Sequence, residues 1–387
     1  MKTALSPIDY YFYRKQLYTI QFVFEYARPL DTLRIEKALR IAEMQFPVLG
    51  SRIRILSGHE ACLESGGTIP FRVQTKIEDV ELDDLEHRFD SMIDEISNTE
   101  GEPLIRILVT KTTSRHYLGV SFSHLLGDGA SFFLFLKILS DICIYQKTTL
   151  TLSTDRQALI PKTSEDLPID TQKLFSTTGY VTPRLPSSIR STVERVNFSN
   201  SDLGRLKSVA AKAGVRISAN DIIMADLLKR FHHEFPLVGK QYLVRCPVDM
   251  RSVDSRLSTN YFGNAVKDAL AFFDVVEIKE FSLAQVAQRI RQAVEGAHSQ
   301  SFQVSLQTLN NLRIQKGFQI FEHLGCPGFL VSNLSKFPVS QINLGTGSPV
   351  GFYHASLNPR LAIVLPGRDG VEVYMKRPNL SSNYSRP

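Results

Sequence analysis

One short segment combines the residue types that proton-transfer chemistry needs, the hexapeptide HLLGDG at residues 124–129. Neutral histidine is a good base near pH 7, because its unperturbed pKa is about 6.5. His124 could therefore take a proton from an alcohol or amine as that group attacks a thioester carbonyl. Gly127 and Gly129 can supply the unusual backbone angles of a tight turn, and Asp128 can hold that turn or pair with a cation. A single His near an Asp is nevertheless more often structural than catalytic.

The neighbouring elements place this histidine at the rim of a predicted sheet. Residues 116–123 (HYLGVSFS) predict a strand, and residues 131–145 predict a helix. Lys137 and Asp141 interrupt the apolar run of that helix, which indicates a buried helix and not a membrane span. Strand ends that run into a helix through a tight turn are common places for functional side chains. The location therefore favours a functional His124.

The rest of the chain divides into two halves in which strands and helices alternate, which predicts an α/β (α+β) fold with a shared cleft. Residues 146–186 are polar and rich in Pro, Thr and Ser, so they indicate a long crossover. We predict an N-terminal half at 1–150, a crossover linker at 151–194 and a C-terminal half at 195–387. The predicted strands are 17–27, 52–56, 71–74, 104–111, 116–123, 195–198, 241–248, 328–333, 361–365 and 371–375, and the predicted helices are 31–44, 82–96, 131–145, 202–213, 218–231 and 282–298.

Composition argues against several classes of protein. The 387 residues carry a net charge of +6, but the basic residues form no long run, so we expect no nucleic-acid partner. No run of about 18 apolar residues predicts a membrane span, and the N-terminus has no apolar signal segment. The four cysteines are spaced singly, as is typical of reduced thiols in a cytoplasmic protein. The other histidines lack ligand-like spacing, so we predict no metal site.

Several segments, taken in order, resemble the BAHD acyltransferases, a family related to chloramphenicol acetyltransferase and to the condensation domains of peptide synthetases. Residues 124–129 match its HxxxDG motif, and residues 248–251 followed by 261–265 match its VDxR and YFGNA stretch. The resemblance covers nearly the whole chain. The further segments that resemble the family are LSPID at 5–9, the helix end with FPVLG within 39–53, ISANDIIMADLL at 217–228, and residues 331–349 and 364–366.

This resemblance implies two similar chloramphenicol-acetyltransferase-like domains, each a mixed β-sheet with flanking helices, with the active site between them. His124 takes the position of the general base. Asp128 is expected to point away from the chemistry and to pair with Arg251, while Gly129 and Asn264 support the site. The implied reaction is direct transfer of an acyl group from acyl-CoA, as co-substrate, to a hydroxyl or amine of a small-molecule acceptor. The implied enzyme is a monomer with no permanently bound cofactor.

One motif departs from the family pattern. The family's DFGWG sequence is replaced by NLGTG at residues 343–347, and the chain contains no Trp. The two glycines remain, which fits a turn that needs them for its backbone. Thr346 could donate a hydroxyl hydrogen bond to an oxyanion, a contribution of a few kcal/mol where one good donor is involved. A role as a small turn residue is an equally open interpretation of Thr346.

Three alternatives remain open. A condensation-type domain would take its acyl group from a carrier protein, but such sites usually show a double His, and Ser123 occupies the first position here. The single-domain chloramphenicol acetyltransferase arrangement has its His near the C-terminus at a trimer interface, whereas His124 lies in the first third of this chain. A non-catalytic binding protein on the same scaffold fits the altered NLGTG segment, but the intact His124, Asp128 and Arg251 oppose it.

Overall fold

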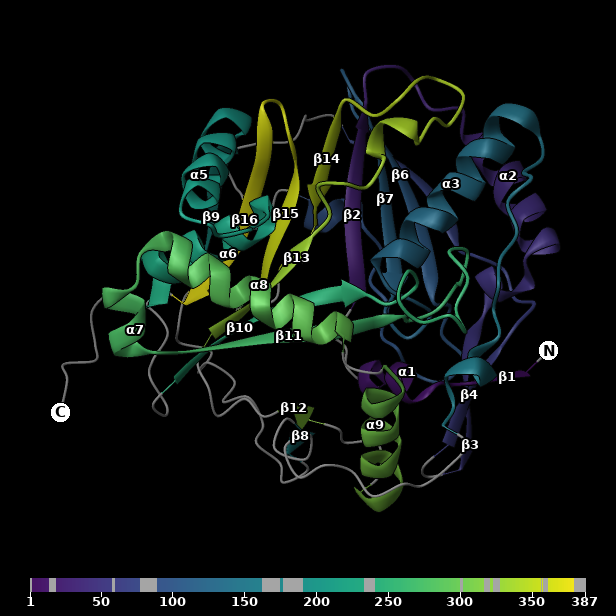
Figure 1. The fold of residues 1–387 in the computed structure, drawn as a ribbon. Helices are drawn as coiled ribbons and strands as arrows, with labels where there is room; N and C mark the ends of the chain where they lie inside the picture. Colours follow the sequence, from purple (N-terminus) through teal and green to yellow (C-terminus); the bar gives the residue numbers. More distant parts are fainter. Residues whose placement is uncertain are drawn as a thin grey trace.

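The computed structural model describes residues 2–13, 19–57, 60–76, 89–161, 175–176, 191–232, 241–299, 302–316, 321–322, 328–355, 357 and 361–378. Two main sheets lie side by side, each with helices packed on it (Figure 1). Each sheet has its own large hydrophobic core. The predicted class, α/β with two halves, is confirmed by this arrangement.

The first sheet has the strand order β14-β2-β7-β6-β5 and contains the strand that leads to His124. β7 lies between β2 and β6, and every residue of it after His116 is buried. Helices α2 and α3 pack against each other on this half. The bounds are β14 (Gly351–His354), β2 (Thr19–Tyr26), β7 (His116–Ser123), β6 (Ile105–Lys111), β5 (Phe71–Thr75), α2 (Thr32–Gln45) and α3 (Gly129–Tyr145).

The second sheet has the order β11-β10-β13-β15-β16-β9 and is mixed, since β10, β13 and β15 are parallel neighbours and the other pairs are antiparallel. Helices α6 and α8 pack together, and α8 also contacts β10 and β11. The bounds are β11 (Val266–Asp274), β10 (Gln241–Asp249), β13 (Gly328–Asn333), β15 (Leu361–Gly367), β16 (Gly370–Pro378), β9 (Ser191–Ser199), α5 (Asn200–Lys212), α6 (Ala219–Phe231), α7 (Val275–Glu280) and α8 (Leu283–Ser299).

Smaller elements complete the described chain. A three-stranded sheet and a two-stranded pair lie outside the two main sheets. Helix α9 packs on the short helix α1 near the ends of β10 and β11 (Figure 1). The bounds are β1 (Lys2–Ala4), β4 (Glu60–Glu64), β3 (Arg52–Ser57), β8 (Phe175–Ser176), β12 (Phe321–Glu322), α1 (Pro7–Phe12), α9 (Phe302–Lys316), η1 (Pro47–Gly50), η2 (Asp90–Met92), η3 (Arg156–Leu159) and η5 (Val339–Gln341).

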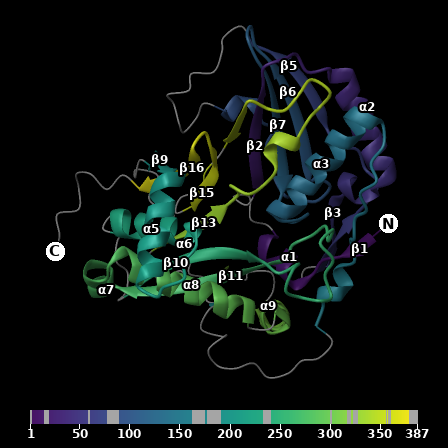
Figure 2. The same cartoon turned by 45° about the horizontal axis from the view of Figure 1, so that its top comes forward.

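Segments from each half of the sequence enter the core of the other half. Strand β14 comes late in the chain but pairs with β2 in the first sheet. Ile8 and Phe12 of α1, together with Leu159 of η3, belong to the second core. Figure 2 shows α1 beneath the region where the two sheets approach each other. The two halves are therefore linked by exchanged segments as well as by the chain that joins them.

The predicted elements agree with the described structure in most places. Strands β2, β6 and β7 and helices α2, α3, α6 and α8 lie where the sequence predicted them. Most of the predicted helix 82–96 lies outside the described residues, and its described end holds the short turn η2. Strand β11 and helix α9 were not predicted.

Candidate active site

His124 is the first residue after β7, and the chain turns sharply behind it. The Leu126 backbone N–H donates to the Ser123 carbonyl at 3.0 Å, which closes the turn. The Ser123 side chain is fully buried and donates to the Asn98 side-chain oxygen. Ser123 is therefore held in the core, while His124 keeps part of its surface exposed. This alternation follows from the strand period, in which successive side chains point to opposite faces.

Gly127 is needed for space and not for backbone freedom. A Cβ atom at Gly127 would lie 2.6 Å from the Ser131 Cβ and 3.5 Å from the Gly263 Cα. Neither Gly127 nor Gly129 has a positive φ, so the expectation that these glycines supply unusual backbone angles was wrong. Gly129 instead begins α3, where an added Cβ would lie 3.4 Å from the Leu334 side chain. The small residues let the turn approach both α3 and the second half of the chain.

Asp128 turns away from the exposed side of the site and caps α3. Its carboxylate accepts hydrogen bonds from the backbone N–H groups of Ser131 at 3.1 Å and Ala265 at 2.9 Å. Two further bonds of 2.9 Å come from the Arg251 guanidinium, so the predicted Asp128–Arg251 pair is present. Burial alone would raise the pKa of Asp128, but the charge of Arg251 and these hydrogen bonds outweigh it and hold the pKa below its usual range.

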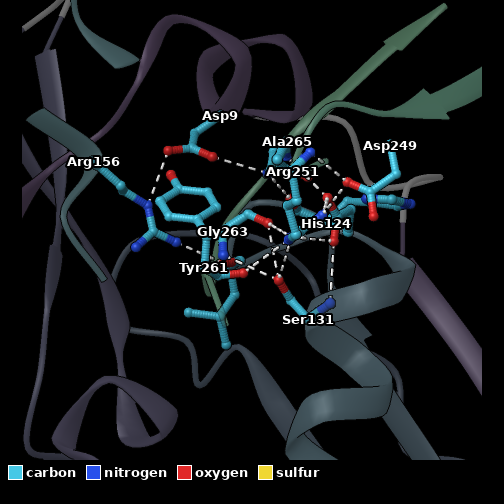
Figure 3. A network of polar contacts seen from close by, with 12 residues as sticks. Asp9, His124, Ser131, Arg156, Asp249, Arg251, Tyr261, Gly263 and Ala265 are labelled. Atoms are coloured by element: carbon cyan, nitrogen blue, oxygen red, sulfur yellow. Dashed lines mark hydrogen bonds and ion pairs between the residues drawn. The ribbon is translucent and has the colours of Figure 1, made fainter. Parts of the chain in front are cut away.

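Arg251 is fully engaged by partners from both halves. Besides Asp128, its guanidinium donates to the Tyr261 carbonyl at 3.1 Å, the Gly263 carbonyl at 2.9 Å and the Asp249 carboxylate at 3.0 Å. The Ser131 hydroxyl of α3 donates to the Gly263 carbonyl at 2.9 Å and accepts from the Gly263 N–H at 3.0 Å. Figure 3 shows these contacts converging beside His124. The HLLGDG turn is thus fastened to the loop before β11.

Asn264 is buried and joins this loop to the histidine. Its side-chain NH₂ donates to the His124 carbonyl oxygen at 2.7 Å and to Asp9 Oδ1 at 2.8 Å. Asp9 lies in α1 and is fully buried. Its Oδ2 atom accepts from Arg156 Nε of η3 at 3.0 Å, which gives a second buried ion pair near the histidine (Figure 3).

The imidazole of His124 stacks on the ring of Phe12, with 4.5 Å between ring centroids and 12° between planes. Its Nδ1 atom is buried and has no hydrogen-bond partner among the described residues. Burial lowers the pKa of His124 to about 4, although the charge of Asp128 and the approach of Asn264 and Gly127 act in the opposite direction. The ring is therefore neutral at physiological pH, the form that can accept a proton.

Thr346 lies away from this cluster. Its loop is anchored by Asn343, whose backbone N–H donates to the Ser140 hydroxyl at 3.0 Å. Ser140 is eleven residues beyond Gly129 in α3, roughly 16 Å by the helical rise. On the other side of the loop, an added Cβ at Gly345 would meet the Arg34 side chain of α2. Because the loop packs so far from the start of α3, we do not retain Thr346 as an oxyanion donor.

Two further observations concern what the site could hold. A cavity of about 170 Å³ is lined by residues of α3, of the 259–261 loop and of the 338–342 segment. Arg251 and Tyr261 border it but His124 does not, so we do not assign it to substrate. Within the described ranges, no cluster of three or more His, Cys, Asp or Glu side chains is arranged to bind a metal ion. The described helices also include none long and apolar enough to cross a bilayer.

A model of the Transferase family matches residues 72–380, which is most of the chain. The chain belongs to the BAHD family. Members of this family transfer acyl groups from coenzyme A thioesters to hydroxyl or amine acceptors. The resemblance inferred from HLLGDG, VDMR and YFGNA is therefore confirmed. In this BAHD chain the three segments contact one another through Asp128, Arg251 and Asn264.

Two curated relatives of this BAHD protein come from plants. Acyltransferase Pun1 of Capsicum frutescens is 25% identical over 263 residues, covering 65% of this chain and 57% of Pun1. The chain thus spans less than two thirds of the length of Pun1. Spermidine sinapoyl-CoA acyltransferase of Arabidopsis thaliana is 26% identical over 323 residues, covering 77% of this chain and 70% of that protein.

Solved structures show the same fold. The crystal structure of TRI101 of F. graminearum, complexed with coenzyme A and deoxynivalenol, has a TM-score of 0.79 to this chain. Its sequence is 15% identical, and the match covers 98% of this chain and 95% of TRI101. At that identity the likeness concerns the fold, and it confirms the expected two-domain architecture.

Sequence reasoning missed three residues that surround His124. Asp9 belongs to the LSPID segment, so the family resemblance of that segment was an available signal. Phe12 follows three residues later and carried no signal of its own. Arg156 lies in the polar crossover, where no motif or periodicity marked it. The structure brings Asp9 to Asn264 and Phe12 to His124, and it pairs Arg156 with Asp9.

Proposed function

We propose that this chain transfers an acyl group from acyl-CoA to a hydroxyl or amine of a small-molecule acceptor, with His124 as the general base. The observation that carries the proposal is the difference between His124 and Asp128 in the HLLGDG turn. His124 keeps a partly exposed, neutral imidazole at the end of β7. Asp128 has its carboxylate committed to Arg251, Ser131 and Ala265. The turn thus presents one proton acceptor to substrate.

In this mechanism His124 removes the proton of the acceptor while the acceptor oxygen or nitrogen bonds to the thioester carbonyl carbon. The carbon–sulfur bond then breaks, and the imidazolium returns the proton to the departing thiolate. A depressed pKa keeps the base unprotonated before attack. The buried charge of Asp128 favours the imidazolium that forms during attack, because it raises the pKa of His124.

The structure gives no support to a covalent acyl-enzyme at this site. The Ser123 hydroxyl is buried and bonded to Asn98. The three described cysteines, Cys62, Cys143 and Cys246, are buried free thiols, and burial raises the pKa of each thiol. Direct transfer is therefore the proposed route. We further propose that the protein acts as a monomer in the cytoplasm, because one chain supplies both sides of the site and its described thiols are free.

Measurement of free coenzyme A tests this proposal. Purified protein is mixed with a panel of acyl-CoA donors and with alcohol and amine acceptors, and thiol release is followed for wild type, His124→Ala and His298→Ala. His298 is exposed at the end of α8, so it is a matched control. Acceptor-dependent release that is lost only in His124→Ala supports the proposal.

The same assay identifies the alternatives. Activity with acylated carrier proteins but not with acyl-CoA would show that the donor is a carrier-protein thioester and not a coenzyme A thioester. Folded wild-type protein that neither releases thiol nor binds coenzyme A would overturn the enzymatic proposal and favour a binding protein on this scaffold.

A further inference from the structure

A second ion pair, separate from Asp128 and Arg251, lies beside the histidine. Asp9 and Arg156 are 0% and 1% exposed and are joined at 3.0 Å. Arg156 also donates to the Leu126 carbonyl of the HLLGDG turn at 2.6 Å. The Asp9 carboxylate additionally accepts from the backbone N–H and hydroxyl of Ser6 at 2.9 and 2.8 Å. One contact network therefore joins α1, η3 and the turn that carries His124.

Asn264 connects this pair to the histidine, and its two acceptors fix the orientation of its amide. The Asn264 NH₂ group faces Asp9 Oδ1 and the His124 carbonyl oxygen. If the amide were flipped, its oxygen would face a carboxylate and a carbonyl, neither of which can donate a hydrogen bond. Asn264 Oδ1 must therefore point elsewhere.

The Asn264 side-chain oxygen and the Nδ1 atom of the His124 imidazole are complementary as acceptor and donor. Asn264 Oδ1 and His124 Nδ1 are both buried, and both lack a hydrogen-bond partner among the described residues. A buried polar atom without a partner is costly. An N–H on Nδ1 directed toward Oδ1 would satisfy both atoms at once. In that tautomer the lone pair of the neutral ring lies on Nε2.

We propose that Asp9, held by Arg156, orients Asn264 so that the Asn264 side-chain oxygen fixes the proton of neutral His124 on Nδ1 and leaves Nε2 as the base. Asp9, Arg156 and Asn264 are positioning residues, since they act through the imidazole and not on the substrate. The catalytic consequence rests on the proposed function, because a fixed tautomer matters only if His124 accepts a proton.

Other groups around the ring bear on this proposal. The charged groups near His124 are Asp9 of α1, Arg156 of η3, Asp128 of the turn and Arg251 after β10, with the buried Tyr261 phenol beside them. The Gly127 carbonyl also approaches the imidazole and raises its pKa, as does Asn264. Gly127 is therefore the competing acceptor for the Nδ1 proton, and an experiment must separate it from Asn264.

Nitrogen-15 NMR of the imidazole distinguishes the two acceptors. The protein is labelled with ¹⁵N-histidine, and two-bond correlations report which ring nitrogen carries the proton at neutral pH. His124→Gln assigns the His124 resonances by their loss. The wild type is expected to show the Nδ1–H tautomer. This readout uses resting protein without substrate, so it stays informative even if the proposed reaction is absent.

Two variants remove the proposed restraint in different ways. Asn264→Ala deletes the acceptor and leaves both ion pairs in place. Asp9→Leu/Arg156→Met removes the acceptor of the Asn264 hydrogen bond and both charges together, so that no unpaired charge is buried. The matched control is Asp202→Leu/Arg205→Met, which makes the same changes in an exposed pair of α5. Melting curves first confirm that each protein is folded.

We expect both test variants to shift the tautomer equilibrium toward Nε2–H, and the control to leave it unchanged. Their kcat should fall at least about tenfold, less than the ~10²–10⁴-fold that loss of a general base itself costs, with little change in KM. An Nδ1–H tautomer that persists in folded Asn264→Ala would overturn the proposal. The Gly127 carbonyl would then be the acceptor of the Nδ1–H hydrogen bond. A wild-type Nε2–H tautomer would also overturn it.

Discussion

Substitution of Asp128 by Ala removes the centre of the contact between the two halves. The Asp128 carboxylate accepts hydrogen bonds from Ser131, Ala265 and both terminal nitrogens of Arg251. After the change, the buried Arg251 guanidinium keeps its ion pair with Asp249, whose side chain is 53% exposed. Helix α3 also loses the side chain that caps its first turn.

The magnitude follows from these contacts. Removal of one partner of a buried ion pair costs about 3–5 kcal/mol. Loss of a helix N-cap costs about 1 kcal/mol more. Because Asp249 still offsets part of the Arg251 charge, we expect Asp128→Ala to lower the free energy of unfolding by about 4 kcal/mol rather than by the full sum. For a chain of this size the melting temperature should fall by about 5 °C.

Thermal melting followed by circular dichroism provides the assay. Asp202→Ala is the control, since Asp202 pairs with Arg205 at the surface, 3.4 Å away, and is well exposed; its melting temperature should match that of wild type. Asp128→Ala/Arg251→Leu should recover part of the loss, because no charge is then left buried without a partner. A folded Asp128→Ala protein that melts at the wild-type temperature would refute the buried pairing.

Three other predictions follow from the surroundings of His124. Because burial lowers the His124 pKa from its usual 6.5 to about 4, the unfolded chain binds more protons between these values. His124 should therefore contribute a rise in stability of about 3 kcal/mol from pH 4 to pH 6.5, and urea denaturation of His124→Gln should show a rise that is smaller by this amount. The acid limb of the pH profile of kcat/KM should likewise lie near pH 4. Phe12→Ala removes the ring that stacks on the imidazole, so it should move this limb toward pH 6.5. A limb that does not move would argue against desolvation of the imidazole by Phe12. Gly127→Ala, whose Cβ would lie 2.6 Å from the Ser131 Cβ, should lower urea stability by about 1–3 kcal/mol, whereas Gly204→Ala, with open space around it, should not lower it.

Local patterns predicted the strand, turn and helix around His124. Strand β7 lies in the interior of its sheet, and helix α3 is buried along most of its length, so both have apolar sequences with clear ends. Helix α9 was missed because its apolar residues follow no strong helical stripe. Strand β11 was missed although residues 269–273 (ALAFF) form a short apolar run between Asp268 and Asp274, a signal that a strand search could have found.

The parts of the site that local patterns did not predict depend on long-range contacts. Asp9 and Arg156 are 147 residues apart in the chain, and their pairing produces no local spacing signal. The Asp128–Arg251 pair spans 123 residues and was inferred because both residues lie in segments that resemble a known family. The role of Gly127 was also misjudged, since close packing against Ser131 and Gly263 is a tertiary property.

The most direct test of the central claim compares kcat for wild type and His124→Ala with one identified donor and acceptor. Coenzyme A binding is measured in parallel by calorimetry. Removal of a general base should lower kcat by about 10²–10⁴-fold, while the affinity for coenzyme A and the melting curve stay close to those of wild type. Wild-type kcat in a folded His124→Ala protein would contradict the assignment of His124 as the base.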